Sequence, residues 1–538
     1  MADMLLEKMQ LVAGALAVAV SFWAIYRWLK PKPIPGFPHN PITSIFGDIP
    51  EFIRLMKDEQ LSLVDYVALL VERHGPAVQF FIGKSVTLLV ADHAEIDRLY
   101  LRGKSIDMSD AIIAAFQHVL PTGQIALPTN TVWKSHRRII GPAMHRRYLS
   151  RMAPHVCAAA NQLVDLWSVK ANIACGESFN ASPDIKLSTM STTDSIITGQ
   201  PFGCLARALY STTKKDSSKP GVAEFSSGSS PSVCQAINTM MDSVTFALQL
   251  PFSPVLFPIY LLFNRKWHRD RQRIRSYLWT RVEEAKKRED MLTESSDLLT
   301  DADCVIDMII QQELRESSET FSKEEMLDEL MTFFMAGQET TAVATSWFVK
   351  FIALDFDIQR RLHEEVCAVF GDSLTDMSSI TLDTLDDPER IPILEAVTAE
   401  TLRCGLVGPA SKRRLVADEL IMGRHVPKGT EIMALNGLLG LSEAAWGDDA
   451  KQWRPSRWLR ADGSFDRNAG PTGYPFGIGP RACFGQRLAM MQLKIFIATF
   501  SRAFVFRSVA PSVNSWASTT IITNRPIESY VALDRWGP

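Results

Sequence analysis

The sequence predicts a mainly α-helical protein whose chain begins with one membrane-spanning helix. The run Leu11–Tyr26 is mostly apolar and uncharged. With Met9 and Leu29 at its ends it approaches the ~20 residues that a membrane-spanning helix needs. A β-hairpin pattern occupies residues 77–90. Most of the chain beyond it has the apolar spacing of helices, most clearly over Glu324–Leu354.

Composition excludes several classes of protein. The 538 residues are 46% hydrophobic and 22% charged, which is ample for a large core. The net charge of −3 gives no indication of a nucleic-acid partner. The eight cysteines are scattered singly, without a Cys-x-x-Cys pair. This argues against zinc ribbons and disulfide scaffolds and favours a reducing compartment.

The N-terminal apolar run is predicted to be an uncleaved anchor, residues 1–30, rather than a secretory signal peptide. Asp3 and Glu7 precede the run, and it continues past the small-residue site Ala17–Ala19. A signal peptide has a basic start and a short apolar core instead. Three basic residues follow the run: Arg27, Lys30 and Lys32. Because positive charge stays on the cytosolic side, we expect the body of the protein in the cytosol.

A proline-rich hinge, residues 31–38, follows the anchor. Its four prolines predict a stiff, extended spacer between the membrane and the globular body. Further on, Ala77–Ile82 and Val86–Val90 flank Gly83 and predict a β-hairpin.

Three later segments are predicted from their composition. Ser211–Pro231 is rich in Ser, Lys, Gly and Thr and predicts a mobile surface loop. Pro251–Phe263 is apolar, broken by prolines and too short to span a bilayer. It is therefore either core or a patch that dips into the membrane. Arg265–Arg288 predicts a charged helix with a solvated face.

The helix predicted over Glu324–Leu354 contains candidate catalytic groups. Gly337 costs about 1 kcal/mol relative to alanine inside a helix, which indicates that something flat approaches there. Ala336, Gly337 and Thr340 share one helix face. Glu339 adds an acid, so this face has what proton delivery requires. The alternative is a helix-packing glycine followed by a threonine that bonds back to its own helix.

Cys483 is the candidate metal ligand. It lies in a loop with Gly477, Gly479 and Gly485, directly before a predicted helix that begins at Gln486. Free backbone N–H groups and the positive end of that helix favour a thiolate. The glycines let backbone approach a large flat group, and such a thiolate is a good axial ligand for haem iron. The alternative is a buried, inert cysteine.

The cysteine loop matches the pattern Phe-x-x-Gly-x-x-x-Cys-x-Gly from Phe476 to Gly485. It resembles the haem-binding loop of the cytochrome P-450 superfamily, the haem-thiolate monooxygenases. Three further motifs of that family occur in family order, at Trp133–Arg137, Ala336–Thr341 and Glu400–Arg403. The resemblance covers nearly the whole chain. It implies one mainly α-helical haem domain with small β-sheets, residues 39–538, behind the anchor and hinge.

The resemblance implies a role for each matched residue. Cys483 would be the axial ligand of the iron of haem b. Thr340 and Glu339 would be the catalytic proton relay. The other residues that would contact the haem are Trp133, Arg137, Gly337, Arg414, Phe476 and Arg481. A buried structural network would consist of Glu400, Arg403 and Arg457.

Two departures from the family pattern affect these assignments. Trp453 stands where the family usually has phenylalanine. Cys404–Pro409 holds one proline where the family often has a pair, which leaves the path of this substrate-lining segment open. Arg414 is assigned by spacing, with Lys412 and Arg413 beside it as alternatives.

The activity implied is insertion of one oxygen atom of O2 into a lipophilic small molecule. Electrons would come from a membrane-bound, NADPH-fed flavoprotein reductase, which alone would carry NADPH and flavins. Its docking surface would be basic, including Arg146, Arg147 and Arg487. The expected location is the endoplasmic reticulum membrane, with the body on the cytosolic face. Two alternatives are a haem-thiolate isomerase or dehydratase acting on a peroxide, and a non-catalytic haem-binding protein.

The lipophilic substrate is inferred from apolar residues near the helix glycine. These side chains would line a pocket or else form plain core: Ile112, Ile113, Phe116, Phe333, Phe334 and Met335.

Overall fold

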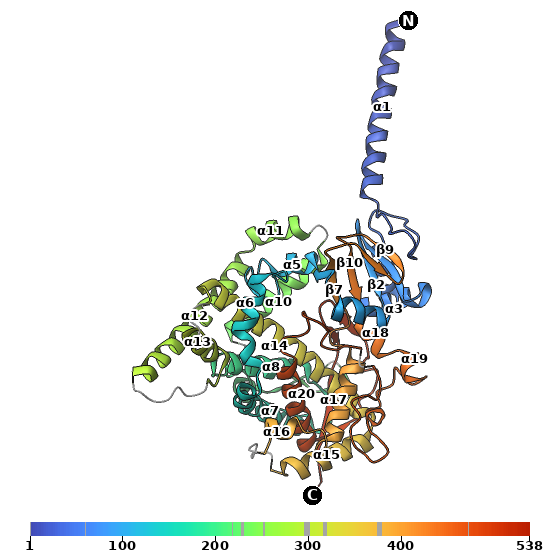
Figure 1. Ribbon diagram of the computed structural model, residues 1–538. Coiled ribbons are helices and arrows are strands. Elements are labelled where there is room, and N and C mark those ends of the chain that lie inside the picture. Colours follow the sequence, from blue (N-terminus) through green and yellow to red (C-terminus); the bar gives the residue numbers. More distant parts are fainter. Residues whose placement is uncertain are drawn as a thin grey trace. The chain divides into compact units, whose positions relative to one another are not determined.

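The computed structural model describes two compact units (Figure 1). The first comprises residues 1–107 and 412–435, and the second comprises residues 108–411 and 436–538. Within these limits the described residues are 2–59, 61–217, 219–226, 231–250, 253–294, 302–315, 320–373, 379–471 and 473–537.

The first unit is built from N-terminal helices and a sheet completed by strands from far along the chain. Its helices are α1 (Ala2–Leu29), α2 (Ile49–Asp58), α3 (Leu63–His74), α4 (His93–Ile96) and the π-helical η1 (Asp97–Arg102). Its strands are β1 (Ala77–Ile82), β2 (Ser85–Val90), β3 (Ile106–Met108), β7 (Ser411–Leu415), β8 (Glu419–Ile421), β9 (Arg424–Val426) and β10 (Glu431–Ala434).

The predicted β-hairpin is confirmed as β1 and β2. The strands pair antiparallel with Ile82 opposite Ser85, and Gly83 adopts φ 56° in the turn, which glycine does without strain. β10 then adds parallel to the other edge of β2. The resulting sheet has the order β1-β2-β10-β7-β3, so its middle strand comes from the C-terminal third of the chain.

Helix α1 matches the predicted anchor in length and character. In the described part of the chain, Val12–Leu29 is the one helix of sufficient length and apolarity to cross a membrane. Its apolar side chains are exposed, as lipid contact requires.

The proline-rich hinge is docked on the sheet. Ile34 and Phe37 are buried. The Ile34 N–H donates to Oε1 of Gln79 at 2.6 Å, and Nε2 of Gln79 donates to the Phe37 carbonyl at 2.8 Å. Gln79 is itself fully buried on β1. The spacer expected from composition is therefore also a packed part of the first unit.

The second unit is mainly helical. Its longer helices are α5 (Asp110–Phe116), α6 (Thr131–Ile140), α7 (Arg146–Ala174), α8 (Ser182–Thr198), α9 (Cys204–Ser211), α10 (Ser232–Gln249), α11 (Ser253–Phe263), α12 (Arg265–Glu294), α13 (Val305–Arg315), α14 (Lys323–Phe351), α15 (Phe356–Phe370), α17 (Pro392–Gly405) and α20 (Gln486–Ala503). Short helical turns are η2 (Gly141–Met144), η3 (Ile352–Leu354), α16 (Leu382–Leu385), α18 (Asn436–Gly440), α19 (Glu443–Trp446) and η4 (Pro455–Trp458).

Small sheets complete the second unit. The strands are β4 (Phe179–Asn180), β5 (Lys214–Lys215), β6 (Glu224–Phe225), β11 (Phe504–Arg507), β12 (Ser518–Thr520), β13 (Asn524–Pro526) and β14 (Tyr530–Arg535). They form the sheet β11-β14-β4 and the pairs β12-β13 and β5-β6.

Helix α14 runs through the middle of the second unit (Figure 1) and contacts α8, α17 and α20. A capping box starts it: Oγ of Ser322 accepts from the Glu325 N–H, and the Glu325 carboxylate accepts from the Ser322 N–H. This arrangement satisfies two N–H groups that a helix start otherwise leaves unpaired. The helix is buried along most of its length, so the long helix predicted from the sequence is confirmed as the centre of this unit.

Two segments predicted from composition take definite structure. The segment Ser211–Pro231 contains the pair β5 and β6, while its residues 218 and 227–230 lie outside the described residues. Helix α11 is apolar and interrupted by Pro258, and its most exposed residues are Val255, Leu262 and Phe263. The predicted residues 251 and 252 lie outside the described residues. Of the two predictions for this segment, plain core is wrong for most of α11.

Candidate active site

The cysteine loop is a tight turn that ends at helix α20. The Cys483 N–H donates to the Phe476 carbonyl at 2.8 Å, so the two ends of the motif close on each other. Gly477 and Gly479 adopt φ 67° and 75°, a left-handed conformation that favours glycine. The thiol of Cys483 is exposed, whereas α20 behind it is buried for most of its length.

The pKa of the Cys483 thiol is raised, contrary to the lowering expected from the loop. Burial within dense protein raises this pKa, while the Gly485 N–H and the charge of Arg137 oppose the shift. The Cys483 side chain is therefore accessible to solvent while dense protein surrounds it. Here desolvation outweighs the helix dipole, so the loop alone does not stabilise the thiolate.

Trp133 lies within cation–π distance of two guanidinium groups beside this loop. The Arg137 guanidinium lies 5.1 Å from the Trp133 ring centroid and that of Arg481 lies 4.4 Å from it. Nη2 of Arg137 donates to the carbonyls of Pro480 and Ala482, both at 3.3 Å. Cation–π attraction to the indole face holds both cations in place. The sequence-predicted residues Trp133, Arg137 and Arg481 are therefore brought together with the cysteine loop.

Residues 122–129 form a strap that holds Arg481. Arg481 donates to Oγ1 of Thr129 at 2.9 Å, to the Gln124 carbonyl at 3.2 Å and to the Leu127 carbonyl. The strap is in turn fixed to α14, because the Gln124 N–H and Nε2 donate to the Glu329 carboxylate at 2.6 and 2.9 Å.

His136 joins helix α6 to the same carboxylate. Its Nδ1 lies 2.7 Å from Oε1 of Glu329, and both side chains are buried. Burial alone would lower the pKa of His136, but the hydrogen bond and charge of Glu329 outweigh it and raise the pKa. Glu329 thus connects α14, the strap and α6.

The predicted catalytic face of α14 contains a gap in an otherwise buried helix. Ala336 is exposed and Thr340 is partly exposed. Oγ1 of Thr340 donates to the Ala336 carbonyl at 2.8 Å. Gly337 is also partly exposed, and a Cβ added there would meet Thr193 of α8 at 3.4 Å. Gly337 therefore allows α14 to pack closely on α8, and its contact with a flat group stays a prediction.

Glu339 faces two cations. Its carboxylate lies 3.8 Å from Nη1 of Arg525 and 4.0 Å from Nζ of Lys186. These cations come from β13 and α8, so the acid next to Thr340 is partly compensated by charges from two other elements.

Phe333 and Phe484 link the gap on α14 to the cysteine loop. Their ring centroids lie 6.0 Å apart, edge to face, and they stand three residues before Ala336 and one residue after Cys483. Oγ1 of Thr341 donates to Oε1 of Gln492 at 3.1 Å, which ties α14 to α20. The exposed positions Ala336 and Cys483 are therefore held in neighbouring parts of one unit.

Glu400, Arg403 and Arg457 form a buried ionic network. Nε and Nη2 of Arg403 donate to the two Glu400 oxygens at 2.7 and 2.8 Å, and Nε of Arg457 donates to Oε1 at 2.9 Å. Nε1 of Trp458 adds a fourth hydrogen bond to Glu400 at 2.9 Å. Burial opposes ionisation, but the Arg403 contacts outweigh it and lower the pKa of Glu400. Glu400 and Arg403 on α17 are thereby fixed to the η4 turn.

For the remaining predicted residues, the structure gives less information about contact with haem or substrate. Phe476 is half-buried and packs against the core of the second unit. Arg414 lies on β7 in the first unit, so its haem contact stays a prediction. Of the apolar residues expected near the pocket, Phe334 is core: it stacks on Phe202 at 5.8 Å between centroids.

Comparisons with known proteins agree with this geometry. The Cytochrome P450 family model matches residues 38–524. The chain belongs to the cytochrome P450 family. Cytochrome P450 monooxygenase TRI13 of Fusarium sporotrichioides is 27% identical over 96% of this chain and 98% of its own length. Cytochrome P450 monooxygenase GME11363 of Pestalotiopsis microspora is 26% identical over 97% of each chain. Cytochrome P450 72A13 of Arabidopsis thaliana is 25% identical over 96% of each chain.

As a P-450, the protein is an oxidoreductase that incorporates oxygen, with haem as its cofactor. The residues present fit that group. Cys483 and Ala336 are both exposed, in the loop before α20 and in the otherwise buried α14. Burial lowers the pKa of Arg137, and among the described residues its hydrogen-bond partners are carbonyl oxygens. A desolvated cation of this kind suits a carboxylate such as a haem propionate.

Sequence reasoning missed Glu329, His136 and Gln124. These residues are polar and fully or nearly buried, yet they lie far apart in the chain, so no spacing pattern connects them. The available signal was the acidic pair Asp328-Glu329 inside an apolar helix pattern, because buried carboxylates require partners.

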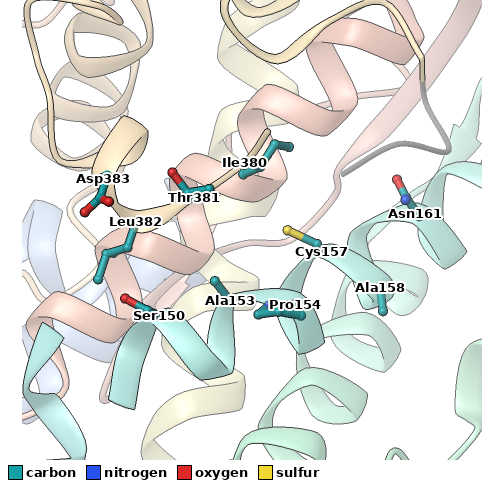
Figure 2. A pocket seen from close by; sticks show the side chains of 10 residues that line it. All are labelled: Ser150, Ala153, Pro154, Cys157, Ala158, Asn161, Ile380, Thr381, Leu382 and Asp383. Atoms are coloured by element: carbon teal, nitrogen blue, oxygen red, sulfur yellow. The ribbon is translucent and has the colours of Figure 1, made fainter. Parts of the chain in front are cut away.

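A separate cavity of about 560 Å³ lies between α7 and residues 380–383 (Figure 2). None of the predicted haem or catalytic residues lines it. Burial raises the pKa of its Cys157 thiol to about 12, which leaves that cysteine a poor nucleophile.

Proposed function

We propose that this P-450 inserts one oxygen atom of O2 into a lipophilic small molecule, with electrons from an NADPH-fed flavoprotein reductase. The observation that carries the proposal is the pair of exposed positions, Cys483 in the loop before α20 and Ala336 in the otherwise buried α14, joined through Phe484 and Phe333. A thiolate-ligated haem supplies activation of dioxygen when bound.

The chain's own residues would hold the haem and move protons. Cys483 would ligate the iron of haem b through Sγ. Trp133, Arg137 and Arg481 would hold the propionates, and Arg414 would add a further contact. Phe476 would form an apolar wall. Oγ1 of Thr340 would hold a proton donor at the Ala336 gap, with Glu339 as the acid behind it. Glu400, Arg403 and Arg457 would act structurally.

The electron partner would dock on exposed arginines. Arg147 and Arg487 are exposed, and Arg487 lies in the first turn of α20, directly after the cysteine loop. Arg146 is also exposed and is paired with Asp383 and with Asp386 at 2.9 Å. An acidic reductase surface would be steered to this site by Arg146, Arg147 and Arg487.

The protein would be a single-pass protein of the endoplasmic reticulum with its body in the cytosol. Helix α1 supports residues 1–30 as the anchor, with 31–38 as the hinge and 39–538 as the haem domain. The exposed apolar residues of α11 support a second contact with lipid. A protein that lacks residues 1–30 should stay partly bound to lipid vesicles. Adding the substitutions Leu262→Ser and Phe263→Ser should abolish this remaining binding, and this comparison tests the contact of α11 with lipid.

The decisive experiment combines the absorption spectrum of the reduced CO complex with a measurement of NADPH consumption and product formation. Full-length protein in nanodiscs should give a reduced CO complex that absorbs at the long wavelength of thiolate-ligated haem, and Cys483→Ser should lose that band. With reductase present, substrate should increase NADPH consumption and yield a product one oxygen heavier. Conversion of a peroxide without NADPH would favour the isomerase or dehydratase, and turnover of neither kind would favour a haem-binding protein.

A further inference from the structure

Two cysteines thirty positions apart in the sequence come together in the second unit. Sγ of Cys204 and Sγ of Cys234 lie 3.3 Å apart. Cys204 is the first residue of α9 and Cys234 lies in the first turn of α10. In the described part of the chain, this is the one place where two sulfur atoms lie within hydrogen-bond distance.

The pair lies in a small apolar cluster. Cys204 is 3% exposed and Cys234 is 1% exposed, and both pack with Met190 of α8. Half-buried Leu187 and Phe202 cover the cluster. Only an oxidant close to water in size can reach sulfur atoms enclosed in this way.

The two thiols differ in their surroundings. Both stand in the first turn of a helix, Cys204 in α9 and Cys234 in α10, so the charges around them make the difference. The two thiols are hydrogen-bonded to each other, and either can donate; this contact, helped by the charge of Arg207, lowers the pKa of Cys204. The same contact and burial raise the pKa of Cys234. The charge of Arg207 beside Cys204 favours Cys204 as the nucleophile of the pair.

We propose that Cys204 and Cys234 form a reversible disulfide in which Cys204 reacts with hydrogen peroxide and Cys234 resolves the product. The Cys204 sulfur attacks one peroxide oxygen: an S–O bond forms, the O–O bond breaks, and hydroxide leaves. The Cys234 sulfur then attacks the Cys204 sulfur, the S–S bond forms, and the S–O bond breaks. The thiol protons convert both released oxygens to water, so two thiols and one peroxide give one disulfide and two waters.

The bond would join two differently supported helices. Helix α9 packs on α7 and α8, whereas α10 packs on α12 and α5 and leads into the exposed α11. Phe202, two residues before Cys204, stacks on Phe334 of α14. A Cys204–Cys234 disulfide would therefore fix α10 to the helices that support α14. This site depends on no residue of the haem pocket.

Peptide mapping of the full-length protein tests the proposal without substitution. Protein treated with equimolar hydrogen peroxide, then denatured and alkylated, should lose two of its eight alkylatable thiols. The Cys204 and Cys234 peptides should appear linked and should separate on reduction. Cys483 is monitored in the same map, so its own oxidation is counted apart. Cys204 and Cys234 remaining alkylatable while exposed Cys175 is oxidised would overturn the proposal.

Single variants test the order of the two thiols. In Cys234→Ser treated with hydrogen peroxide and then unfolded in the presence of dimedone, Cys204 should be labelled as a sulfenic acid, whereas in Cys204→Ser treated in the same way Cys234 should stay unlabelled. The reverse labelling would overturn the assignment.

The oxidised wild-type protein should also melt several degrees above the reduced protein, because the cross-link constrains the unfolded chain. That difference should vanish in Cys204→Ser and persist in Cys304→Ser, which removes a buried cysteine elsewhere; a difference that persists in both is evidence against the bond.

Discussion

Thr340 and Thr345 make the same hydrogen bond in different surroundings. Oγ1 of Thr340 donates to the carbonyl four residues earlier at 2.8 Å, and Oγ1 of Thr345 does so at 2.9 Å. Thr345 is fully buried, whereas Thr340 lies at the gap beside Ala336. Their contributions to the helix are therefore alike, and a difference between their alanine variants reports on the gap.

Thr340→Ala should separate electron consumption from product formation. The variant should keep its haem and its CO band, because within the described residues the Thr340 hydroxyl donates to its own helix. Loss of a positioned proton donor costs about 10²–10⁴-fold in the assisted step. NADPH consumption should continue while hydrogen peroxide replaces much of the hydroxylated product, measured as product formed per NADPH.

Thr345→Ala is the matched control for that measurement. It should keep the wild-type ratio of product to NADPH, with at most a small loss of thermal stability. An unchanged ratio in Thr340→Ala, or the same fall in both variants, would remove Thr340 from the proton path.

Asp194 should make stability depend on pH. It is fully buried on α8 and accepts from the Tyr277 hydroxyl at 2.8 Å. Burial raises the pKa of Asp194 from 3.8 to about 7. The folded protein therefore holds a proton that the unfolded chain releases between these values. Stability from this group falls as pH rises through that range, by up to about 1.4 kcal/mol per pH unit.

Asp194→Asn should remove this dependence, because an amide keeps the oxygen that accepts from Tyr277 and cannot ionise. Thermal melts at pH 5.5 and pH 8 should show a smaller difference in the variant than in the wild type. The same substitution at exposed Asp357 of α15 should leave the difference unchanged. A wild-type difference retained in Asp194→Asn would assign the effect to another group.

At the scale of an element, α17 is held to the η4 turn by one carboxylate. Glu400→Ala would strand the buried Arg403 and Arg457 guanidiniums and the Trp458 N–H. Removing one partner of a buried ion pair costs about 3–5 kcal/mol. We expect a lower melting temperature and poor haem retention, measured by scanning calorimetry and by haem content per chain.

Arg360→Ala on α15 is the comparison for Glu400→Ala. Arg360 also pairs with two carboxylates, Asp357 and Glu364, but these side chains are exposed. Exposed pairs contribute about 0–1 kcal/mol, so stability and haem content should hardly change. A Glu400→Ala variant that is stable, haem-loaded and inactive would point to a catalytic role for Glu400.

The sequence predicts those elements whose cause is local. Helix α14, the β1–β2 hairpin and the Glu400–Arg403 pair follow from spacing over a few residues. The packing of Thr193 against Gly337, the Glu329 link to the strap and the Cys204–Cys234 contact join distant segments. No pattern along the chain reports them. The direction of the Cys483 pKa shift also depends on burial, which the loop sequence does not contain.

At the scale of the whole molecule, the hinge should contribute to stability as well as to attachment. Removing residues 1–30 should leave a folded protein, because the exposed α1 side chains do not belong to its core. Removing residues 1–38 should cost about 2–5 kcal/mol more, since it uncovers the sites of Ile34 and Phe37 and leaves Gln79 without its partners. Thermal melts of the two truncated proteins provide the measurement.

A second measurement uses the Gln79→Ala substitution in the protein that lacks residues 1–30. It should reproduce part of the loss caused by removing the hinge. Equal melting temperatures for all three proteins would mean that residues 31–38 only tether the body.

The sheet of the first unit also constrains the order of events during synthesis. Strand β2 emerges early, but its partner β10 pairs Glu431 with Thr87 and Ala434 with Val90, roughly 340 residues later. At the usual elongation rate of about 5–20 residues per second, β2 waits tens of seconds with one edge unpaired. Unpaired edges recruit other strands. A nascent chain stalled before Glu431 should therefore bind chaperones at β2, and release them once β10 leaves the ribosome.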